Sequence, residues 1–162
     1  HDQAGETTEI ISVNDLLDAA VSELHGTPKV DVACEDSAHA QQLRLPTTTA
    51  SAAIRALIEN ARAASRPDQS VHVSAHGSAE ACTIVVQDRG EGMDQHILQH
   101  ATEPFFTTKE TGKGMGLGLF LAREIFERLG GKLQLESAQN EGTTATITLP
   151  WATATPISES TR

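Results

Sequence analysis

Short apolar segments separated by turn residues predict a chain built of brief strands. The alternation is clearest over residues 29–35, where the apolar Val30, Val32 and Cys34 alternate with residues that are polar except for Ala33, as in a half-buried strand. Turn residues at 77–78 and 140–142 predict two hairpins. The expected strands are residues 9–13, 29–35, 41–45, 71–75, 82–87, 132–137 and 143–149.

Three further segments have helical spacing of their apolar residues. The first carries Leu16, Leu17, Ala20, Val21 and Leu24, with Ser12 or Asn14 as its cap and a stop at Gly26 and Pro28. The second covers about residues 47–65. The third opens at Gly116 and ends at Gly130–Gly131, which is a C-cap signal. The Gly- and Thr-rich residues 89–114 read as one long connection.

The order of these elements predicts an α+β fold, with one sheet and its helices on one face. We expect one domain over residues 9–150, preceded by a polar segment at 1–8 and followed by a polar, disordered tail at 151–162.

Charge and composition restrict the possible partners. The net charge of −10 argues against nucleic acid as the main ligand, because phosphate backbones require basic patches. We find no apolar run that could cross a membrane and expect no signal peptide. Cys34 and Cys82 lie in separate apolar segments without metal-ligand spacing, which favours buried free thiols in a reducing compartment.

Four glycines alternate with other residues from Gly112 to Gly118, directly before a helical segment. Free amides at a helix N-terminus form an anion site, so the segment is a candidate phosphate cradle. It has neither the Walker nor the Rossmann spacing. Taken alone, the segment is equally consistent with a flexible surface loop.

The helix expected at 47–65 has three faces. Ile54, Leu57, Ile58 and Ala61 form an apolar stripe. Arg55, Glu59, Arg62 and Arg66 share a second face, where surface ion pairs explain Glu59. The third face consists of alanines at 53, 56, 63 and 64 around Asn60. This shelf of small residues favours a ligand or metal role for Asn60 over a solvated amide.

Five motifs occur in one order along the chain. They are Leu57-Ile58-Glu59-Asn60-Ala61, Asp88-x-Gly90-x-Gly92-Met93, Glu103-Pro104-Phe105-Phe106-Thr107-Thr108-Lys109, Gly112-Lys113-Gly114-Met115-Gly116-Leu117-Gly118-Leu119, and Gly142-Thr143-x-Ala145-x-Ile147-x-Leu149-Pro150. Over about residues 9–150 the chain resembles the catalytic ATP-binding domain of bacterial sensor histidine kinases, within the GHKL ATPase superfamily. The motifs match the N, G1, F, G2 and G3 boxes of that family.

The resemblance implies a Bergerat ATP-binding fold, a two-layer sandwich of a mixed, mostly antiparallel sheet covered by about three helices. It implies that Asp88 accepts the adenine amino hydrogen with support from Thr143, that Gly90 and Gly92 let the backbone approach the base, and that Asn60 binds Mg²⁺. Phe105, Phe106 and residues 94–113 would form a mobile lid, from which Lys109 reaches a phosphate. The implied catalytic residues are Asn60 and Lys109. The implied ATP contacts are Asn60, Ala63, Asp88, Gly90, Gly92, Met93, Phe105, Thr108, Lys109, Gly112, Gly114, Met115, Gly116, Leu117, Gly118 and Thr143.

Three positions depart from the family pattern. Ala56 stands where hydrolytic members have a glutamate as general base and many sensor kinases a second asparagine. This departure disfavours autonomous hydrolysis. Ala63 replaces a frequent lysine, for which the neighbouring Arg62 is a candidate substitute. Ala145 replaces a frequent phenylalanine, which changes packing only.

None of the seven histidines has the context of a phosphoacceptor, so we expect the acceptor on a dimerisation domain upstream in a longer protein. The resemblance further implies a cognate response regulator, a cytoplasmic domain that is monomeric in isolation, and a homodimeric full protein. That protein can be anchored in the inner membrane by segments outside this chain. The alternatives are a GHKL-type ATPase and a degenerate nucleotide-sensing interaction module.

Overall fold

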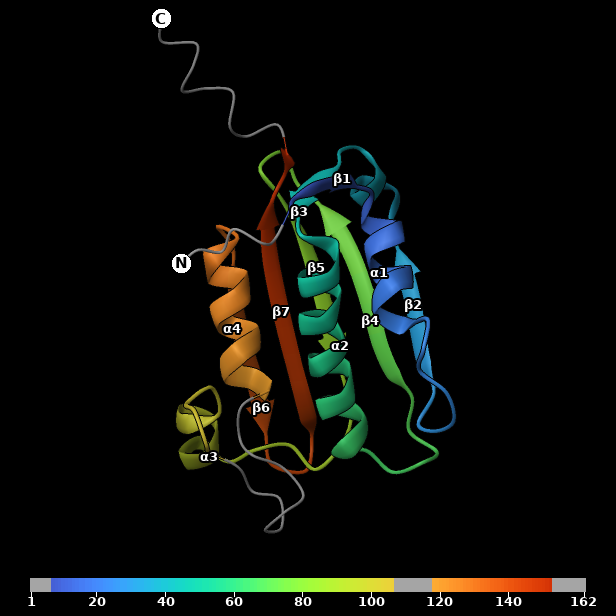
Figure 1. Ribbon diagram of the computed structural model, residues 1–162. Helices are drawn as coiled ribbons and strands as arrows, with labels where there is room; N and C mark the ends of the chain where they lie inside the picture. The colour runs from blue at the N-terminus through green and yellow to red at the C-terminus, as the bar shows by residue number, and fades with distance from the viewer. Residues whose placement is uncertain (1–6, 107–117, 153–162) are drawn as a thin grey trace, which may run out of the picture.

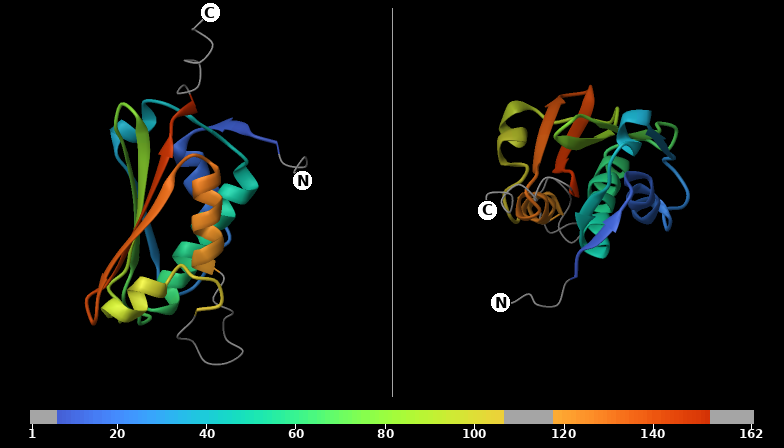
Figure 2. Two further views of the ribbon diagram at one scale, coloured as in Figure 1. Left: turned by 90° about the vertical axis from the view of Figure 1, so that its left-hand side faces the viewer. Right: turned by 90° about the horizontal axis from the view of Figure 1, so that it is seen from above.

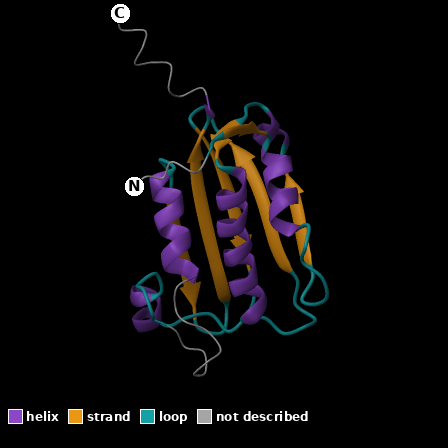
Figure 3. Cartoon of the chain, viewed as in Figure 1, coloured by secondary structure: helices purple, strands orange, loops and turns teal. Residues whose placement is uncertain are grey.

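The computed structural model describes residues 7–106 and 118–152. The elements in chain order are β1 (Glu9–Ile11), α1 (Val13–Val21), β2 (Val30–Cys34), the 3₁₀ helix η2 (Asp36–His39), β3 (Leu43–Leu45), α2 (Thr47–Ala63), β4 (Val71–Gly77), β5 (Ala81–Gln87), α3 (Gln95–His100), α4 (Gly118–Arg128), β6 (Lys132–Ala138) and β7 (Gly142–Pro150). The chain contains both helices and strands, as the sequence predicts for an α+β fold, and the helices lie on one side of the sheet (Figure 3).

Five strands form one mixed sheet in the order β2-β4-β5-β7-β6. Strands β2 and β4 are parallel, and every other neighbouring pair in this sheet is antiparallel. Helices α1, α2 and α4 cover one face, so the molecule has two layers (Figures 1 and 2). The predicted fold class is therefore confirmed, as are the hairpins β4–β5 and β6–β7. No helix of the described part of the chain is long and apolar enough to cross a membrane.

The core lies between the sheet and these three helices. Ile54 and Ile58 of the predicted apolar stripe on α2 are fully buried, as are Ile84 of β5 and Ile147 of β7. On the α4 side, Phe126 is the largest fully buried side chain. Inward residues on these strands alternate with residues of the open face, because a strand turns successive side chains to opposite sides.

The second face of α2 is not a solvated row of charges. The Arg55 guanidinium donates to the carbonyl oxygens of Ala19 and Ala20, at 2.9 and 3.0 Å, and so binds the C-terminal end of α1. Carbonyls in the last turn of a helix lack backbone donors within it, although the C-cap residue Ser22 also donates its hydroxyl to the Ala19 carbonyl, at 3.4 Å. The Glu59–Arg62 ion pair that the sequence predicts is present, at 3.6 Å.

The structure corrects the sequence-based prediction in three places. Strands β1 and β3 form a separate two-stranded sheet, not part of one sheet. The short helix α3 lies within the expected connection, with the Asp94 side chain capping it through the amide of Ile97. Trp151, expected in a disordered tail, is 3% exposed in the core, and its indole N–H donates to the carbonyl of Ser78.

Candidate functional site

Three neighbouring strands bring polar side chains together at one end of the sheet. Asp88 directly follows β5 and lies beside Thr143 of β7, since Gln87 pairs with Thr144. Thr143 in turn pairs with Ser137 of β6. By strand alternation all three belong to the face that the helices cover, together with Val86, Ala145 and Leu135 one step further into the sheet.

Asp88 is held by the backbone around it. Its side chain is 5% exposed, and Oδ1 accepts hydrogen bonds from the amides of Gly90 and Thr143 at 2.8 and 3.2 Å. Burial raises the pKa of this carboxyl, although the two amide hydrogen bonds act in the opposite direction. No described residue donates to Oδ2, so the carboxylate keeps one oxygen as an acceptor for a ligand.

A small pocket opens beside Asp88. It brings together four residues that the sequence predicts as site residues, namely Asn60, Asp88, Met93 and Thr143. The remaining lining is apolar or small and consists of Leu57, Ala61, Val86, Leu119, Leu135 and Ala145. Apolar walls with a few polar groups at one edge suit a flat heteroaromatic ring that carries hydrogen-bond donors.

Asn60 lies in the last turn of α2, on the side that lines the pocket. It is exposed, and its side-chain amide has no hydrogen-bond partner among the described residues. An amide oxygen is a ligand that Mg²⁺ accepts, and Mg²⁺ in nucleotide sites takes one or two protein oxygens plus phosphates and water. The single free amide oxygen of Asn60 therefore fits a Mg²⁺–nucleotide ligand better than a metal ion held by protein alone. The described residues contain no cluster of three or more His, Cys, Asp or Glu suited to a metal.

The glycines after β5 are required by contacts within the protein. A Cβ atom at Gly90 would collide with the carbonyl oxygen of Ala64 at the end of α2. A Cβ atom at Gly92, which has a φ of +67°, would collide with the carbonyl oxygen of Ala138 at the end of β6. The family resemblance implies that both glycines let the backbone approach a base. The structure shows that they also let the loop after β5 pack closely against the end of α2 and the end of β6.

Some predicted site residues lie away from this pocket. Ala63 is exposed on α2, Phe105 is 69% exposed, and Gly118 at the start of α4 has open space around its Cα. The predicted contacts Thr108, Lys109, Gly112, Gly114, Met115, Gly116 and Leu117 lie outside the described residues.

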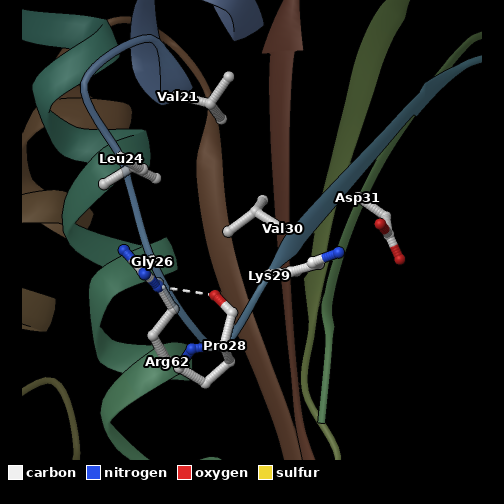
Figure 4. A pocket seen from close by; sticks show the side chains of 8 residues that line it. All are labelled: Val21, Leu24, Gly26, Pro28, Lys29, Val30, Asp31 and Arg62. Carbon is white, nitrogen blue, oxygen red and sulfur yellow. Dashed lines mark hydrogen bonds between the residues drawn. The ribbon is translucent and has the colours of Figure 1, made fainter. Parts of the chain in front are cut away.

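Arg62 is not a substitute for a lysine at position 63 in the Asp88 pocket. Its guanidinium donates to the carbonyls of Pro28 and His25, at 3.0 and 2.7 Å. It lines a second pocket between the end of α1, the start of β2 and α2, with Leu24 and Val30 among its other walls (Figure 4).

The sequence-based search missed the pocket's apolar walls and one polar residue, Ser137. The Ser137 hydroxyl lies 2.8 Å from the Thr143 hydroxyl and accepts a hydrogen bond from the Met93 amide at 2.8 Å. Period-two alternation was the available signal, because Ser137 follows Leu135 by two residues and Thr143 precedes Ala145 by two. Using it required the register between β6 and β7.

The chain is similar to curated sensor kinases. It is 34% identical over 153 residues to the sensor protein kinase FleS of Pseudomonas aeruginosa, an alignment that covers 93% of this chain and 37% of FleS. It is 40% identical over 83 residues to the C4-dicarboxylate transport sensor protein DctB of the same species, covering 51% of this chain and 13% of DctB. The chain thus spans a minor part of the curated relatives it matches.

Solved structures share its fold. The mycobacterial sensor histidine kinase MprB superposes with a TM-score of 0.76 at 22% identity, covering 90% of this chain and 98% of the MprB chain. The catalytic domain of histidine kinase ThkA gives a TM-score of 0.74 at 23% identity, with 89% and 95% coverage.

The model of the family described as "Histidine kinase-, DNA gyrase B-, and HSP90-like ATPase" matches residues 47–153, which is more than half of the chain. The matched range contains α2, the Asp88 loop and the β6–β7 hairpin, the three parts that build the pocket. The chain therefore belongs to the family of histidine kinase-, DNA gyrase B- and HSP90-like ATPases.

Proposed function

We propose that this chain is the ATP-binding catalytic domain of a sensor histidine kinase, which binds Mg²⁺–ATP and donates the γ-phosphoryl group to a histidine on a separate domain. The observation that carries the proposal is the pocket in which Asn60, Asp88 and Thr143 meet. These residues come from α2, the end of β5 and the start of β7, and they supply a metal ligand and a polar base-recognition edge to one cavity.

Asp88 recognises the base in this proposal. Its buried carboxylate keeps Oδ2 free of described donors and so accepts a hydrogen bond from the exocyclic amino group of adenine. Leu57, Val86 and Met93 line the same pocket and pack on the ring. Because Oδ1 is fixed by two backbone amides, the carboxylate is oriented before the nucleotide arrives.

Asn60 holds the metal end of the ligand. When bound, Mg²⁺ neutralises phosphate charge, which is most of what phosphoryl transfer requires from its site. Asn60 contributes an oxygen ligand from α2. We propose Lys109 and the amides of residues 114–117, all outside the described residues, as further phosphate contacts. Transfer then depends on positioning and charge and not on a covalent step through the protein.

The position of Ala56 supports transfer over hydrolysis. Ala56 precedes Asn60 by one helical turn on α2, so a carboxylate at this position would lie on the same face as the metal ligand. Alanine cannot activate water. Among the described residues that line the pocket, Asp88 is the one carboxylate, and it is committed to the base-recognition edge.

Sensor kinases act with partners, and we extend this to the present chain. The acceptor histidine lies on a dimerisation domain of a longer, homodimeric protein, and a cognate response regulator takes the phosphoryl group from it. The isolated chain is a monomeric, cytoplasmic domain. The named relatives FleS and DctB are sensor proteins, which supports this assignment over a stand-alone ATPase or a degenerate binding module.

Titration calorimetry with ATP and ADP, with and without Mg²⁺, tests the nucleotide proposal. We expect binding of both nucleotides and tighter ATP binding when Mg²⁺ is present. Incubation of the chain with radiolabelled ATP and its separately expressed acceptor domain tests transfer, with a variant lacking the acceptor histidine as the control. Steady hydrolysis without an acceptor would favour the ATPase alternative, whereas binding without transfer would favour the degenerate module.

A further inference from the structure

Ser137 has three polar neighbours at one hydroxyl group. Its Oγ lies 2.8 Å from the Met93 amide nitrogen, 2.9 Å from the Gly142 carbonyl oxygen and 2.8 Å from Thr143 Oγ1. These partners belong to the loop after β5 and to the first two residues of β7. Ser137 therefore connects two sides of the pocket that contains Met93 and Thr143.

The chemistry of these partners fixes the direction of each hydrogen bond. A serine hydroxyl has one proton and two lone pairs. The Met93 amide can only donate, so it uses one lone pair of Ser137 Oγ. The Gly142 carbonyl can only accept, so it takes the Ser137 proton. One lone pair remains on Ser137, and the Thr143 hydroxyl satisfies it by donating its own proton.

The direction of the Thr143 proton has a consequence for the pocket. With that proton committed to Ser137, Thr143 Oγ1 has only lone pairs left to offer to a ligand. Beside it, the carboxylate of Asp88 is also an acceptor. The polar edge of the pocket then consists of acceptors and complements a ligand edge that carries donors.

On the basis of the proposed nucleotide function, we infer that Ser137 is a positioning residue that holds the Thr143 hydroxyl as an acceptor and thereby helps the pocket select a 6-amino purine over a 6-oxo purine. An amino group has two protons and can donate directly to these acceptors. A 6-oxo group presents its own lone pairs to the same edge, and leaving polar groups unpaired in a closed site weakens binding. Without Ser137, the Thr143 hydroxyl rotates and donates to a 6-oxo group.

The test compares the dissociation constants of ATP and inosine triphosphate, which differ at C6, where an oxo group replaces the amino group, and at N1, which carries a proton only in the 6-oxo base. We expect wild type to bind ATP more tightly than inosine triphosphate. In Ser137→Ala we expect the ratio of the inosine triphosphate constant to the ATP constant to fall by about tenfold, the equivalent of one hydrogen bond. Ser137→Thr retains the hydroxyl and restores the ratio. Ser74→Ala is the matched control, because Ser74 lies on β4 among the residues of the open face.

Several outcomes would overturn the inference. A folded Ser137→Ala variant with an unchanged ratio, or with both nucleotides weakened equally, shows a purely structural serine. If Ser137→Ala does not fold, Thr143→Val provides the test, since it removes the hydroxyl that Ser137 orients, and an unchanged ratio there also refutes the inference. A wild-type chain that binds neither nucleotide refutes the proposed function itself, which separates the two failures.

Discussion

Asp88 and Thr143 are joined in both directions across β5 and β7. The Asp88 amide donates to the Thr143 carbonyl at 2.9 Å, and the Thr143 amide donates to the Asp88 carboxylate at 3.2 Å. The hydrogen bonding between β5 and β7 thus continues one residue past the end of β5. Its last acceptor is the Asp88 side chain instead of a backbone carbonyl. This link holds a buried carboxylate in place at the edge of the pocket.

Replacing Asp88 by Asn separates function from stability. The new side-chain amide would present a donor to the adenine amino group, so ATP affinity should fall by about 3 kcal/mol, or roughly 150-fold. The free energy of unfolding should not fall. Burial raises the pKa of Asp88 in the folded chain. The protonated carboxyl therefore favours folding below the unfolded-state pKa, and this contribution to stability is lost as pH rises through the folded-state pKa.

At neutral pH the buried charge of Asp88 therefore lowers the free energy of unfolding, and Asp88→Asn removes this charge. Thermal unfolding without nucleotide should show an unchanged or higher Tm for the variant, and calorimetry should show the loss of ATP binding. Retained ATP affinity in a folded variant would reject Asp88 as the base-recognition residue.

Replacing Asn60 by Ala should remove the effect of Mg²⁺ on ATP binding. In wild type we expect Mg²⁺ to tighten ATP at least tenfold, about 1.4 kcal/mol. In Asn60→Ala the affinities with and without Mg²⁺ should converge. Asn14→Ala is a matched control, because Asn14 is exposed in the first turn of α1. A Mg²⁺ effect of wild-type size in Asn60→Ala would place the metal elsewhere.

Gly142 should tolerate a side chain poorly for two separable reasons. Its φ is +98°, and an added Cβ would collide with the Asp88 carbonyl oxygen. Gly26 has a φ of +80° but no atom within 4 Å of an added Cβ, so Gly26→Ala isolates the dihedral cost of about 1 kcal/mol. Gly142→Ala should lose about 3 kcal/mol or more of unfolding free energy in urea titrations. Equal losses in the two variants would mean that the loop yields to the collision.

Arg55 should stabilise the fold through α1. Its guanidinium binds the terminal carbonyls of that helix, so Arg55→Ala should cost about 2 kcal/mol of unfolding free energy. Arg66→Ala is the control, since the Arg66 side chain is 74% exposed in a 3.6 Å ion pair with Asp68 and should change stability by less than about 0.5 kcal/mol. A loss no greater than that of the control would contradict the capping role.

Cys82 should make the fold sensitive to alkali. Burial raises the pKa of this thiol to about 12, against 9.0 for a free thiol. Between these values the unfolded chain loses the proton and the native chain retains it, so stability falls with rising pH by up to about 1.4 kcal/mol per pH unit. Unfolding free energies measured from about pH 8 to about pH 10.5 should decline more steeply in wild type than in Cys82→Ala. Parallel curves would show that the native thiol ionises freely.

Local patterns were sufficient for most elements of the fold. Ser12 caps α1, as the sequence allows, and its side chain accepts from the Asp15 amide three residues later. The stripe Ile54, Leu57, Ile58 and Ala61 is buried. Such features depend on neighbours within one or two turns, so the local sequence is enough to predict them. Asn60 and Asp88 were found differently, through their place in an ordered set of motifs.

Contacts between distant segments were decided by the tertiary structure. From the sequence, Arg55 and Arg62 belong to a charged face of α2. In the structure both donate to backbone carbonyls of α1 and of the residues after it, which lie 34–37 residues away in the chain. The sequence places Trp151 in a polar tail, whereas in the structure its indole N–H donates to the carbonyl of Ser78, 73 residues earlier in the chain.

The same division applies within the pocket. The sequence determined that the Asn60 amide, the Asp88 carboxylate and the glycines of the turns are present and in which order. Only the pairing of β6 with β7 placed the Ser137 hydroxyl against Thr143, and only the fold of the Asp88 loop brought the Met93 amide to it from 44 residues away. The physical reason is that a side chain's residue type sets what it can donate or accept, whereas strand register and packing decide which partner it meets.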